Sequence, residues 1–302
     1  MIPEFPKFKK LEFSDRTDVE KMTHQFQPYS DFNFTSMWSW NVLGQMQLSK
    51  LKGNLIVKFN DYVTGEPFYS FIGLDDVSNT AQQLLNLSIK EGLDPVLKLL
   101  TEETVKKIDH DDFIITTDED SYDYILSVDH LVKYEGSKFT SKRNYIRRFK
   151  NAYSSETRLV DLKDPNIKKK ITDLFNLWRL HKSLGDSYAE HEVISLSRFL
   201  QMDDYSKFIS VGLFIDEALI AFWILEQLDD DKCLSHYEKA NVLEYVGVYP
   251  YLANETAKIL SKMGVKYINF EQDLGIPGLR ESKKSYSPST YLKQYILTYR
   301  NA

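Results

Sequence analysis

Acidic and basic side chains lie close together in one stretch near the end of the chain, residues 269–288. It begins like a strand, with Ile268 and Phe270 on one side and Asn269, Glu271 and Asp273 on the other. A turn with two glycines and a proline follows, and then a short polar helix whose cations would share one surface. This order of charges suits a ligand with both a cationic and an anionic group, and it equally suits a solvated strand end followed by a charged surface helix. The candidate residues of this stretch are Asn269, Glu271, Asp273, Arg280, Lys283, Lys284 and Tyr286.

A second pair of candidate residues lies in the segment Ser235-His236-Tyr237-Glu238-Lys239-Ala240. Strand alternation would put His236 and Glu238 on one face. Either side chain could then act as a general base that deprotonates an attacking amine or hydroxyl. A histidine whose hydrogen bonds are satisfied within the sheet explains the same pattern.

Residues 133–150 are strongly basic, with seven Lys or Arg against one acid, Glu135. Ser141 is predicted to cap a helix in which Tyr145, Ile146 and Phe149 face a core. Paired arginines beside a tyrosine could bind the phosphates of a nucleic acid, which makes residues 138–150 a candidate tRNA surface. A solvated helix face between two domains is the alternative. The cations are Lys133, Lys138, Lys142, Arg143, Arg147, Arg148 and Lys150, of which Arg143 and Arg147 would share a face.

Composition limits the class of protein. The chain has 302 residues, roughly two domains' worth, and its 42% hydrophobic and 14% aromatic content is ample for large cores. The net charge of −6 gives no global attraction for polyanions, so any nucleic acid would need a local basic patch. The single cysteine, Cys233, excludes an intramolecular disulfide and a multi-cysteine metal site. The first ten residues lack the apolar core of a secretion signal, and the longest apolar run has eight residues, so we expect a soluble, cytoplasmic protein.

Hydrophobic periodicity predicts a mixed α/β protein in which the two halves repeat one order of elements. We expect a domain at residues 1–140 and a second at 141–302, which carries the candidate site. Two strands, at 113–117 and 123–128, are expected to form an antiparallel pair. Further strands are expected at 51–59, 67–72, 158–162, 208–214, 219–227, 233–240 and 292–299, and helices at 17–26, 35–42, 78–91, 166–182, 190–201 and 249–263.

Common catalytic motifs are missing from the sequence. It has no Gly-rich loop ending in Lys-Ser/Thr, no Gly-x-Gly-x-x-Gly and no His-Glu-x-x-His. A Gly-x-Ser-x-Gly nucleophile motif is missing as well. Kinase, dehydrogenase, zinc-protease and serine-hydrolase functions are therefore disfavoured.

The basic segment, the His236-to-Ala240 segment and the stretch 269–288 together resemble one protein family. It is a domain family of unknown function related to the C-terminal catalytic domain of phosphatidylglycerol lysyltransferases. The resemblance runs from about Ser30 to Leu297. Its most specific parts are Glu271-Gln272-Asp273-Leu274-Gly275 and Lys142-Arg143-Asn144, the latter preceded by Gly136-Ser137-Lys138.

The resemblance implies two tandem GNAT-like (N-acetyltransferase-like) domains, each a twisted, mostly antiparallel sheet flanked by helices. Relatives that include the Fem-type peptidoglycan transferases move an aminoacyl group from charged tRNA to an amine or hydroxyl acceptor. By this resemblance, Glu271 and Asp273 would take the cationic α-amine of the donor or accept a proton, and His236 or Glu238 would assist. The substrate-binding residues would be Arg280 and Lys283, for an anionic group, with Asn269, Tyr286, Lys142, Arg143, Asn144 and Arg147.

Two departures from related enzymes leave three functions open. The lipid-modifying relatives carry a multi-helix membrane domain that is missing here, which argues against a lipid acceptor. Acyl-CoA enzymes of the GNAT class bind pyrophosphate with a Gln/Arg-x-x-Gly-x-Gly/Ala loop, whereas residues 244–250 here have one glycine and a proline without an N–H group. We expect an aminoacyltransferase that uses aminoacyl-tRNA and a small-molecule acceptor. The alternatives are an acyl-CoA N-acyltransferase with an altered loop and a non-catalytic module that binds an anionic ligand or RNA.

Overall fold

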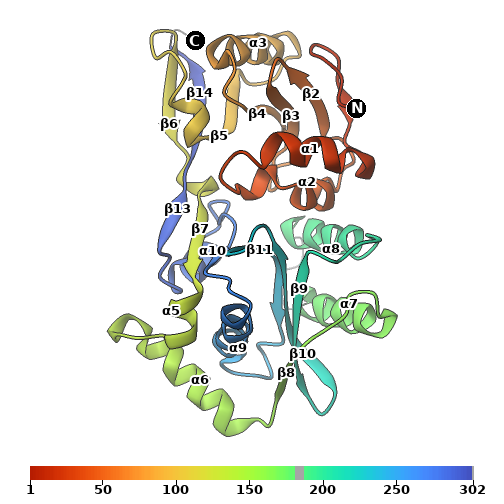
Figure 1. Ribbon diagram of the computed structural model, residues 1–302, viewed down its shortest axis with the longest axis vertical. Coiled ribbons are helices and arrows are strands. Elements are labelled where there is room, and N and C mark those ends of the chain that lie inside the picture. The colour runs from red at the N-terminus through yellow and green to blue at the C-terminus, as the bar shows by residue number, and fades with distance from the viewer. Residues whose placement is uncertain (181–186, 301–302) are drawn as a thin grey trace. The chain divides into compact units, whose positions relative to one another are not determined.

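The computed structural model describes residues 1–180 and 187–300, and the chain forms two compact units (Figure 1). Unit 1 comprises Met1–Asp123, Gln272–Leu279 and Tyr291–Ala302. Unit 2 comprises Tyr124–Glu271 and Arg280–Thr290. The first segment of unit 1 thus ends at Asp123, and two later segments of the chain also belong to unit 1. The expected domain boundary at residues 140 and 141 stays a prediction.

The sheet of unit 1 has the strand order β1-β2-β3-β4-β5-β14-β6. Its strands pair antiparallel except β4 and β5, and the last strand of the chain lies between β5 and β6. The strands are β1 (Lys9–Lys10), β2 (Gln47–Leu51), β3 (Asn54–Asn60), β4 (Pro67–Ile72), β5 (Val96–Thr101), β6 (Phe113–Thr117) and β14 (Gln294–Tyr299). The helices are α1 (Arg16–Thr23), α2 (Phe34–Trp40), α3 (Val77–Lys90) and α4 (Glu102–Val105), with 3-10 turns η1 (Phe13–Asp15), η2 (Ser30–Phe32) and η3 (Glu119–Ser121).

Strand β3 shows why this sheet has helices on both faces. Its three successive residues Leu55, Ile56 and Val57 are apolar and buried, which is the pattern of a strand covered on both sides. Leu55 and Val57 pack in one cluster with the α2 residues Phe34 and Met37. The residue between them, Ile56, packs in another cluster with the buried side chains of α3.

The sheet of unit 2 has the strand order β13-β7-β12-β11-β10-β9-β8. The central strands β9, β10 and β11 form an antiparallel meander, and β12 pairs parallel with β11. The strands are β7 (Asp123–Ser127), β8 (Glu156–Leu159), β9 (Phe208–Ile215), β10 (Ala218–Gln227), β11 (Lys232–Ala240), β12 (Tyr267–Asn269) and β13 (Thr290–Leu292). The helices are α5 (Val128–Lys133), α6 (Thr140–Ala152), α7 (Pro165–Leu180), α8 (Ser187–Phe199), α9 (Val248–Lys262) and α10 (Pro277–Lys284), with a 3-10 turn η4 (Ser137–Phe139).

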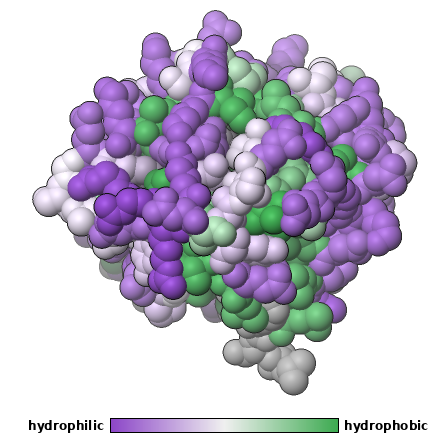
Figure 2. All heavy atoms as spheres, turned by 90° about the horizontal axis from the view of Figure 1, so that it is seen from below, coloured by the Kyte–Doolittle hydropathy of each residue, from purple (hydrophilic) through white to green (hydrophobic). Residues whose placement is uncertain are grey.

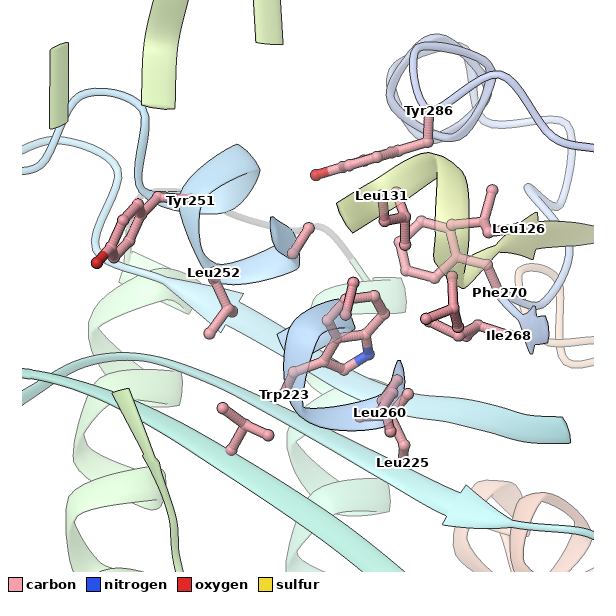
Figure 3. Packing of buried hydrophobic residues seen from close by; sticks show 14 of the residues in the cluster. Leu126, Leu131, Trp223, Leu225, Tyr251, Leu252, Leu260, Ile268, Phe270 and Tyr286 are labelled. Atoms are coloured by element: carbon pink, nitrogen blue, oxygen red, sulfur yellow. The ribbon is translucent and has the colours of Figure 1, made fainter. Parts of the chain in front are cut away.

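The core of unit 2 lies between α9 and the sheet. Figure 3 shows Trp223 and Leu225 of β10 beside Leu252 and Leu260 of α9, with Ile268 and Phe270 close by. Helices α7 and α8 cover the opposite face of strands β9 to β11 (Figure 1). The two faces of this sheet therefore have different neighbours, and the side from which a β11 residue projects decides its surroundings.

The expected mixed α/β class with two mostly antiparallel sheets flanked by helices is confirmed. The predicted pairing of 113–117 with 123–128 is wrong: β6 pairs with β14, and β7 pairs with β12 in the other sheet. The short connection favoured a hairpin, but the final strand supplies hydrogen-bond partners on both of its edges. The predicted helix 166–182 ends at Leu180 in the described part, and its last two residues lie outside the described residues.

Details of the basic helix also differ from expectation. Helix α6 begins at Thr140, and its N-terminus has no side-chain cap, so Ser141 is not the cap residue. Phe149 is buried and Ile146 packs against the core, as predicted, whereas Tyr145 is 46% exposed. Within the described residues, no helix is both long and apolar enough to cross a membrane.

Candidate functional site

An irregularity in β11 decides which of its side chains share a face. Ile224 pairs with Tyr237, whereas the next residue of β10 pairs with Ser235, so His236 is an extra residue in β11. Such a bulge interrupts the alternation of side chains. The prediction that His236 and Glu238 share a face is therefore wrong, and their contacts confirm the separation.

His236 lies on the face covered by α8. Its Nε2 is 3.0 Å from Oε2 of Glu226, and its ring stacks on Phe199 at a centroid distance of 6.2 Å. The side chains of His236 and Glu226 are only 1% and 3% exposed. This geometry favours the interpretation of a histidine satisfied within the sheet over that of a general base.

Two further residues of β11 project toward α7 and α8. Tyr237 Oη is 2.7 Å from Ser195 Oγ in α8. Lys239 donates to Glu192 of α8 at 2.8 Å, and its ammonium group lies 4.1 Å from the ring centroid of Trp178 in α7. Buried charges are normally paired in this way. The lysine thus attaches the two helices to the sheet.

Glu238 lies on the other face, where its charge affects the pKa values of a lysine and several phenols. The pairing of β11 with β12 covers residues 232–234, and Glu238 lies on the continuing part of β11. Its Oε1 is buried and has no hydrogen-bond partner among the described residues. Burial raises the pKa of Glu238 to about 7, against the opposing charges of Lys239, Lys142 and Lys283. We call Glu238, Lys142, Lys283, Tyr134, Tyr249 and Tyr286 the Glu238 cluster.

Lys142 reaches this cluster from α6. Its Nζ donates to Ser285 Oγ at 2.8 Å and lies 3.6 Å from the ring centroid of Tyr286. Burial lowers the pKa of Lys142 to about 8, and the nearby charge of Glu238 partly opposes this shift. An acid and a base with pKa values of about 7 and 8 therefore lie in one cluster, as proton-transfer sites require.

Lys283 reaches the same cluster from α10. It is 9% exposed, donates to the carbonyl oxygen of Phe270, and lies 4.6 Å from the ring centroid of that residue. Phe270 also contacts Trp223 and Tyr286 at centroid distances of 5.6 and 5.7 Å. Figure 3 shows the Tyr286 side chain extending from the turn after α10 near Leu131 and Phe270, with its hydroxyl group pointing away from the helix. Of the cations predicted to lie on this helix, Lys283 is buried and Lys284 is exposed.

The predicted strand end does not continue through Glu271 and Asp273. Strand β12 ends at Asn269, whose Oδ1 accepts a hydrogen bond from the Glu271 backbone at 2.8 Å. Glu271 has a left-handed backbone with φ of 56°, so the alternation of side chains stops there. Asp273 is fully buried in unit 1 and accepts from the backbone of Gly275 at 2.9 Å, whereas Glu271 and Arg280 belong to unit 2. A shared cavity for Glu271, Asp273 and Arg280 stays a prediction.

Unit 1 has a cavity of its own at this segment, with a volume of about 200 Å³. Gln272 and Leu274, the neighbours of Asp273, line it. Three carboxylates and one ammonium group also line it, from Asp61, Asp118, Asp120 and Lys98. The stretch 269–288 therefore contributes residues to both units.

The other predicted residues of α6 lie on its outer side. Arg143 donates to the carbonyl oxygens of Tyr134 at 2.5 Å and Gly136 at 2.7 Å. Arg147 is exposed and donates to Asn144 Oδ1 at 3.2 Å, and Arg148 is exposed as well. Figure 2 shows many hydrophilic side chains on the face seen from below, with hydrophobic ones between them. The segment Lys142-Arg143-Asn144 is therefore divided between the Glu238 cluster and the surface.

Sequence reasoning missed two members of the cluster, Tyr134 and Tyr249. Tyr134 follows α5 and is 1% exposed, and Tyr249 lies in the first turn of α9. The charge of Glu238 contributes to a raised pKa of each phenol, although burial is the larger cause. The two phenols come from separate elements, so no spacing rule connects them. The only signal in the sequence is its abundance of tyrosine, with 19 residues.

The segment that would bind pyrophosphate in acyl-CoA enzymes packs against α6. Gly247 has a φ of 86°, and a Cβ atom added there would lie 2.5 Å from the carbonyl oxygen of Tyr145. The α6 backbone therefore occupies the space beside this glycine. Pro250 in the following turn supplies no N–H group. Both features disfavour a pyrophosphate site of the usual kind.

Gly247→Ala is expected to lower the free energy of unfolding by about 1–3 kcal/mol, since the backbone conformation is strained for alanine and its methyl group meets a carbonyl. Urea denaturation would measure the change. Gly278→Ala is the matched control, because a Cβ atom there meets nothing within 4 Å. Equal stability of the two variants would contradict this account of the loop.

Glu238 is expected to make the folded protein lose stability as the pH rises. Burial raises its pKa from the ordinary value of 4.5 to about 7 in the folded state. Between these values the folded state binds more protons than the unfolded state, so the free energy of unfolding falls with pH and levels off above about 7. Urea denaturation of the native protein and of Glu238→Gln, from about pH 5 to about pH 8, would measure the difference. A difference that does not change with pH would contradict the raised pKa.

The chain is similar to known proteins over most of its length. A family model described as phosphatidylglycerol lysyltransferase, C-terminal, matches residues 23–298. No curated protein matches the chain. Among solved structures, a conserved protein of unknown function from Bacteroides thetaiotaomicron is 26% identical with a TM-score of 0.76, and the match covers 99% of this chain and 100% of that one.

Two other structures share the fold at low identity. L-PGS from Bacillus licheniformis is 13% identical with a TM-score of 0.63, covering 100% of this chain and 95% of that one. FemX is 10% identical with a TM-score of 0.54, covering 98% of both chains. The expected family resemblance is confirmed, and these two structures share the fold of this chain over nearly its whole length.

Proposed function

Since this chain belongs to the phosphatidylglycerol lysyltransferase C-terminal family, we propose that it transfers an aminoacyl group from aminoacyl-tRNA to an amine or hydroxyl acceptor. The observation that carries the proposal is Glu238, a carboxylate with a buried and unpartnered oxygen beside two lysines. An aminoacyl transfer needs a base at this kind of position, because the acceptor must lose a proton as it attacks. The family indicates the type of transfer, and the Glu238 cluster contains a group that could take the proton of the acceptor.

The transfer requires Glu238 to move one proton. The acceptor nitrogen or oxygen forms a bond to the carbonyl carbon of the aminoacyl ester, and its proton passes to the Glu238 carboxylate. The bond between that carbon and the ribose oxygen of tRNA then breaks. Glu238 returns the proton to the ribose oxygen, which leaves as a hydroxyl group. The carboxylate is thus regenerated, and no further reactant is needed.

The electrostatics of the cluster suit this role. A base works best when its pKa lies near the working pH, and burial places that of Glu238 at about 7. Lys142 and Lys283 oppose the effect of burial, so part of the Glu238 population is ionised at neutral pH. Their charges would also favour the negative charge that develops on the carbonyl oxygen.

The α6 surface is the candidate contact for the tRNA. Arg147 and Arg148 are exposed, so they can reach phosphates without first leaving a buried ion pair. Phosphate contacts position a nucleic acid and make binding sensitive to salt. Arg143 contributes less to this surface, because its guanidinium group holds two backbone carbonyls.

Filter binding tests the tRNA contact. The protein is expected to bind total charged tRNA with an affinity that falls as salt rises, and Arg147→Ala/Arg148→Ala is expected to weaken binding about tenfold at low salt and to reduce the salt slope by about two. Lys106→Ala/Lys107→Ala in unit 1 removes the same charge from another surface and serves as control. Equal weakening by both pairs would mean a nonspecific effect of net charge.

Thermal-shift measurements with acetyl-CoA separate the alternative functions. Stabilisation by acetyl-CoA without tRNA binding would favour an acyl-CoA N-acyltransferase and overturn the proposal. Binding of tRNA without transfer to any amine or hydroxyl acceptor in a screen would indicate a binding module. The packing of Gly247 against α6 argues against the first of these outcomes.

A further inference from the structure

Two buried polar atoms of the Glu238 cluster lack a hydrogen-bond partner among the described residues. They are Oη of Tyr134 and Oε1 of Glu238. A buried polar group without a partner costs about 1–3 kcal/mol, so native proteins rarely keep two of them in one place. One is a donor and the other an acceptor, yet they are not bonded to each other. A ligand group with one acceptor and one donor would satisfy both.

The backbone and side chain of Tyr134 are held firmly in place. The residue ends α5 in a left-handed conformation with φ of 46°, and its N–H donates to the carbonyl oxygen of His130 at 2.7 Å. Arg143 donates to the carbonyl oxygen of Tyr134, and the tyrosine ring packs edge-on against Phe139 at a centroid distance of 5.1 Å. Asn254 of α9 donates to the preceding carbonyl groups of α5. A positioned functional group requires support of this kind.

The phenol of Tyr134 remains a donor throughout the neutral pH range. Burial, and then the charge of Glu238, raise its pKa. Burial raises the pKa of Tyr286 well above its ordinary value, and the Glu238 carboxylate and the Tyr134 phenol add to this shift. A protonated phenol can donate its O–H, and it has no negative charge with which to repel an approaching oxygen.

We propose that Tyr134 is a catalytic residue whose O–H donates to the carbonyl oxygen of the aminoacyl ester, while Glu238 takes the proton of the attacking acceptor. This inference rests on the aminoacyl transfer proposed above. The reacting centre has the required pair of groups, since its carbonyl oxygen accepts a hydrogen bond and the acceptor N–H or O–H donates one. Tyr134 stays protonated throughout, and its hydrogen bond strengthens as negative charge develops on the oxygen.

Arg143 follows from this inference as a positioning residue. It is the residue of the basic segment whose guanidinium group spans the carbonyls of Tyr134 and Gly136, and its Nη2 also donates to Thr140 Oγ1. It therefore fixes the turn between α5 and α6, and this turn determines the position of the Tyr134 phenol. Its effect on the reaction is expected to pass through Tyr134 and not through tRNA binding.

Tyr134→Phe tests the donor, because it removes Oη and keeps the ring packed on Phe139. With total tRNA charged with radiolabelled amino acids and a pool of amine and hydroxyl acceptors, kcat is expected to fall about 10²–10³-fold with little change in KM. The variant should be at least as stable as the native protein, since it loses an unpartnered buried group. Tyr251→Phe, on α9 within the same core, is the control and should leave kcat unchanged.

Arg143→Ala tests the positioning residue. It is expected to lower kcat, to leave the salt slope of tRNA binding unchanged, and to add little to the effect of Tyr134→Phe in the double variant. A smaller salt slope with unchanged kcat would instead make Arg143 a phosphate contact. If the native protein transfers and Tyr134→Phe transfers equally fast, the inference about Tyr134 is overturned and the proposed function stands. If the native protein transfers nothing, both fail.

Discussion

Replacing Glu238 with glutamine is expected to slow aminoacyl transfer by about 10²–10⁴-fold, the contribution of a general base to such a reaction. Glutamine keeps nearly the same shape, but it cannot take the proton of the acceptor. The expected loss is in kcat, because nothing in the proposed role requires Glu238 for tRNA binding. Single-turnover transfer from tRNA charged with radiolabelled amino acids would measure it.

The pH profile makes this test specific to a base. The native rate is expected to rise with pH through about 7, as Glu238 ionises, and the rise should disappear in Glu238→Gln. The control is Glu244→Gln, which changes an exposed glutamate in the same unit. A Glu238→Gln variant that keeps both the native rate and the native pH profile would rule out this carboxylate as the base.

Trp223→Ala is expected to lower the free energy of unfolding by about 3–5 kcal/mol, which is the usual loss for a large core side chain. Trp223 is 1% exposed and packs between α9 and Phe270 (Figure 3). Its Nε1 donates to Ser235 Oγ at 2.9 Å, so the substitution also leaves a buried hydroxyl group without its partner. Urea denaturation followed by circular dichroism would measure the loss.

Trp223→Phe separates the two causes of this loss. Phenylalanine keeps an aromatic contact with Phe270 but cannot donate to Ser235, so its loss should be clearly smaller than that of alanine. A loss below about 1 kcal/mol for Trp223→Ala would mean that this core collapses around the gap or contributes little to stability.

The sequence by itself determined the class of fold and most of its elements. Periodicity located the helices around residues 78–91 and 249–263 and the central strands of unit 2, because amphipathic patterns depend on local geometry. It also named Glu238, Lys142 and Lys283 as candidates, because they lie in the three segments that carry the family resemblance.

Tertiary structure alone decided how these residues come together. The bulge at His236 puts Glu238 on the opposite face of β11 from the one that strict alternation predicts. The bulge arises from the pairing of β11 with β10, which the sequence of β11 alone does not reveal. Likewise, β14 completes the first sheet from the far end of the chain, because hydrogen-bond partners are set by topology and not by proximity in sequence.

The role of Arg143 shows the same limit at the level of one side chain. Its neighbours in sequence predicted a phosphate contact, whereas the fold directs its guanidinium group to the carbonyl at the end of α5. Tyr134 has no spacing relation to Glu238, since the two lie on elements that meet only when α5 and β11 join one core. Sequence pattern therefore specifies which residues are charged or buried, and the packing of distant elements specifies which of them form a site.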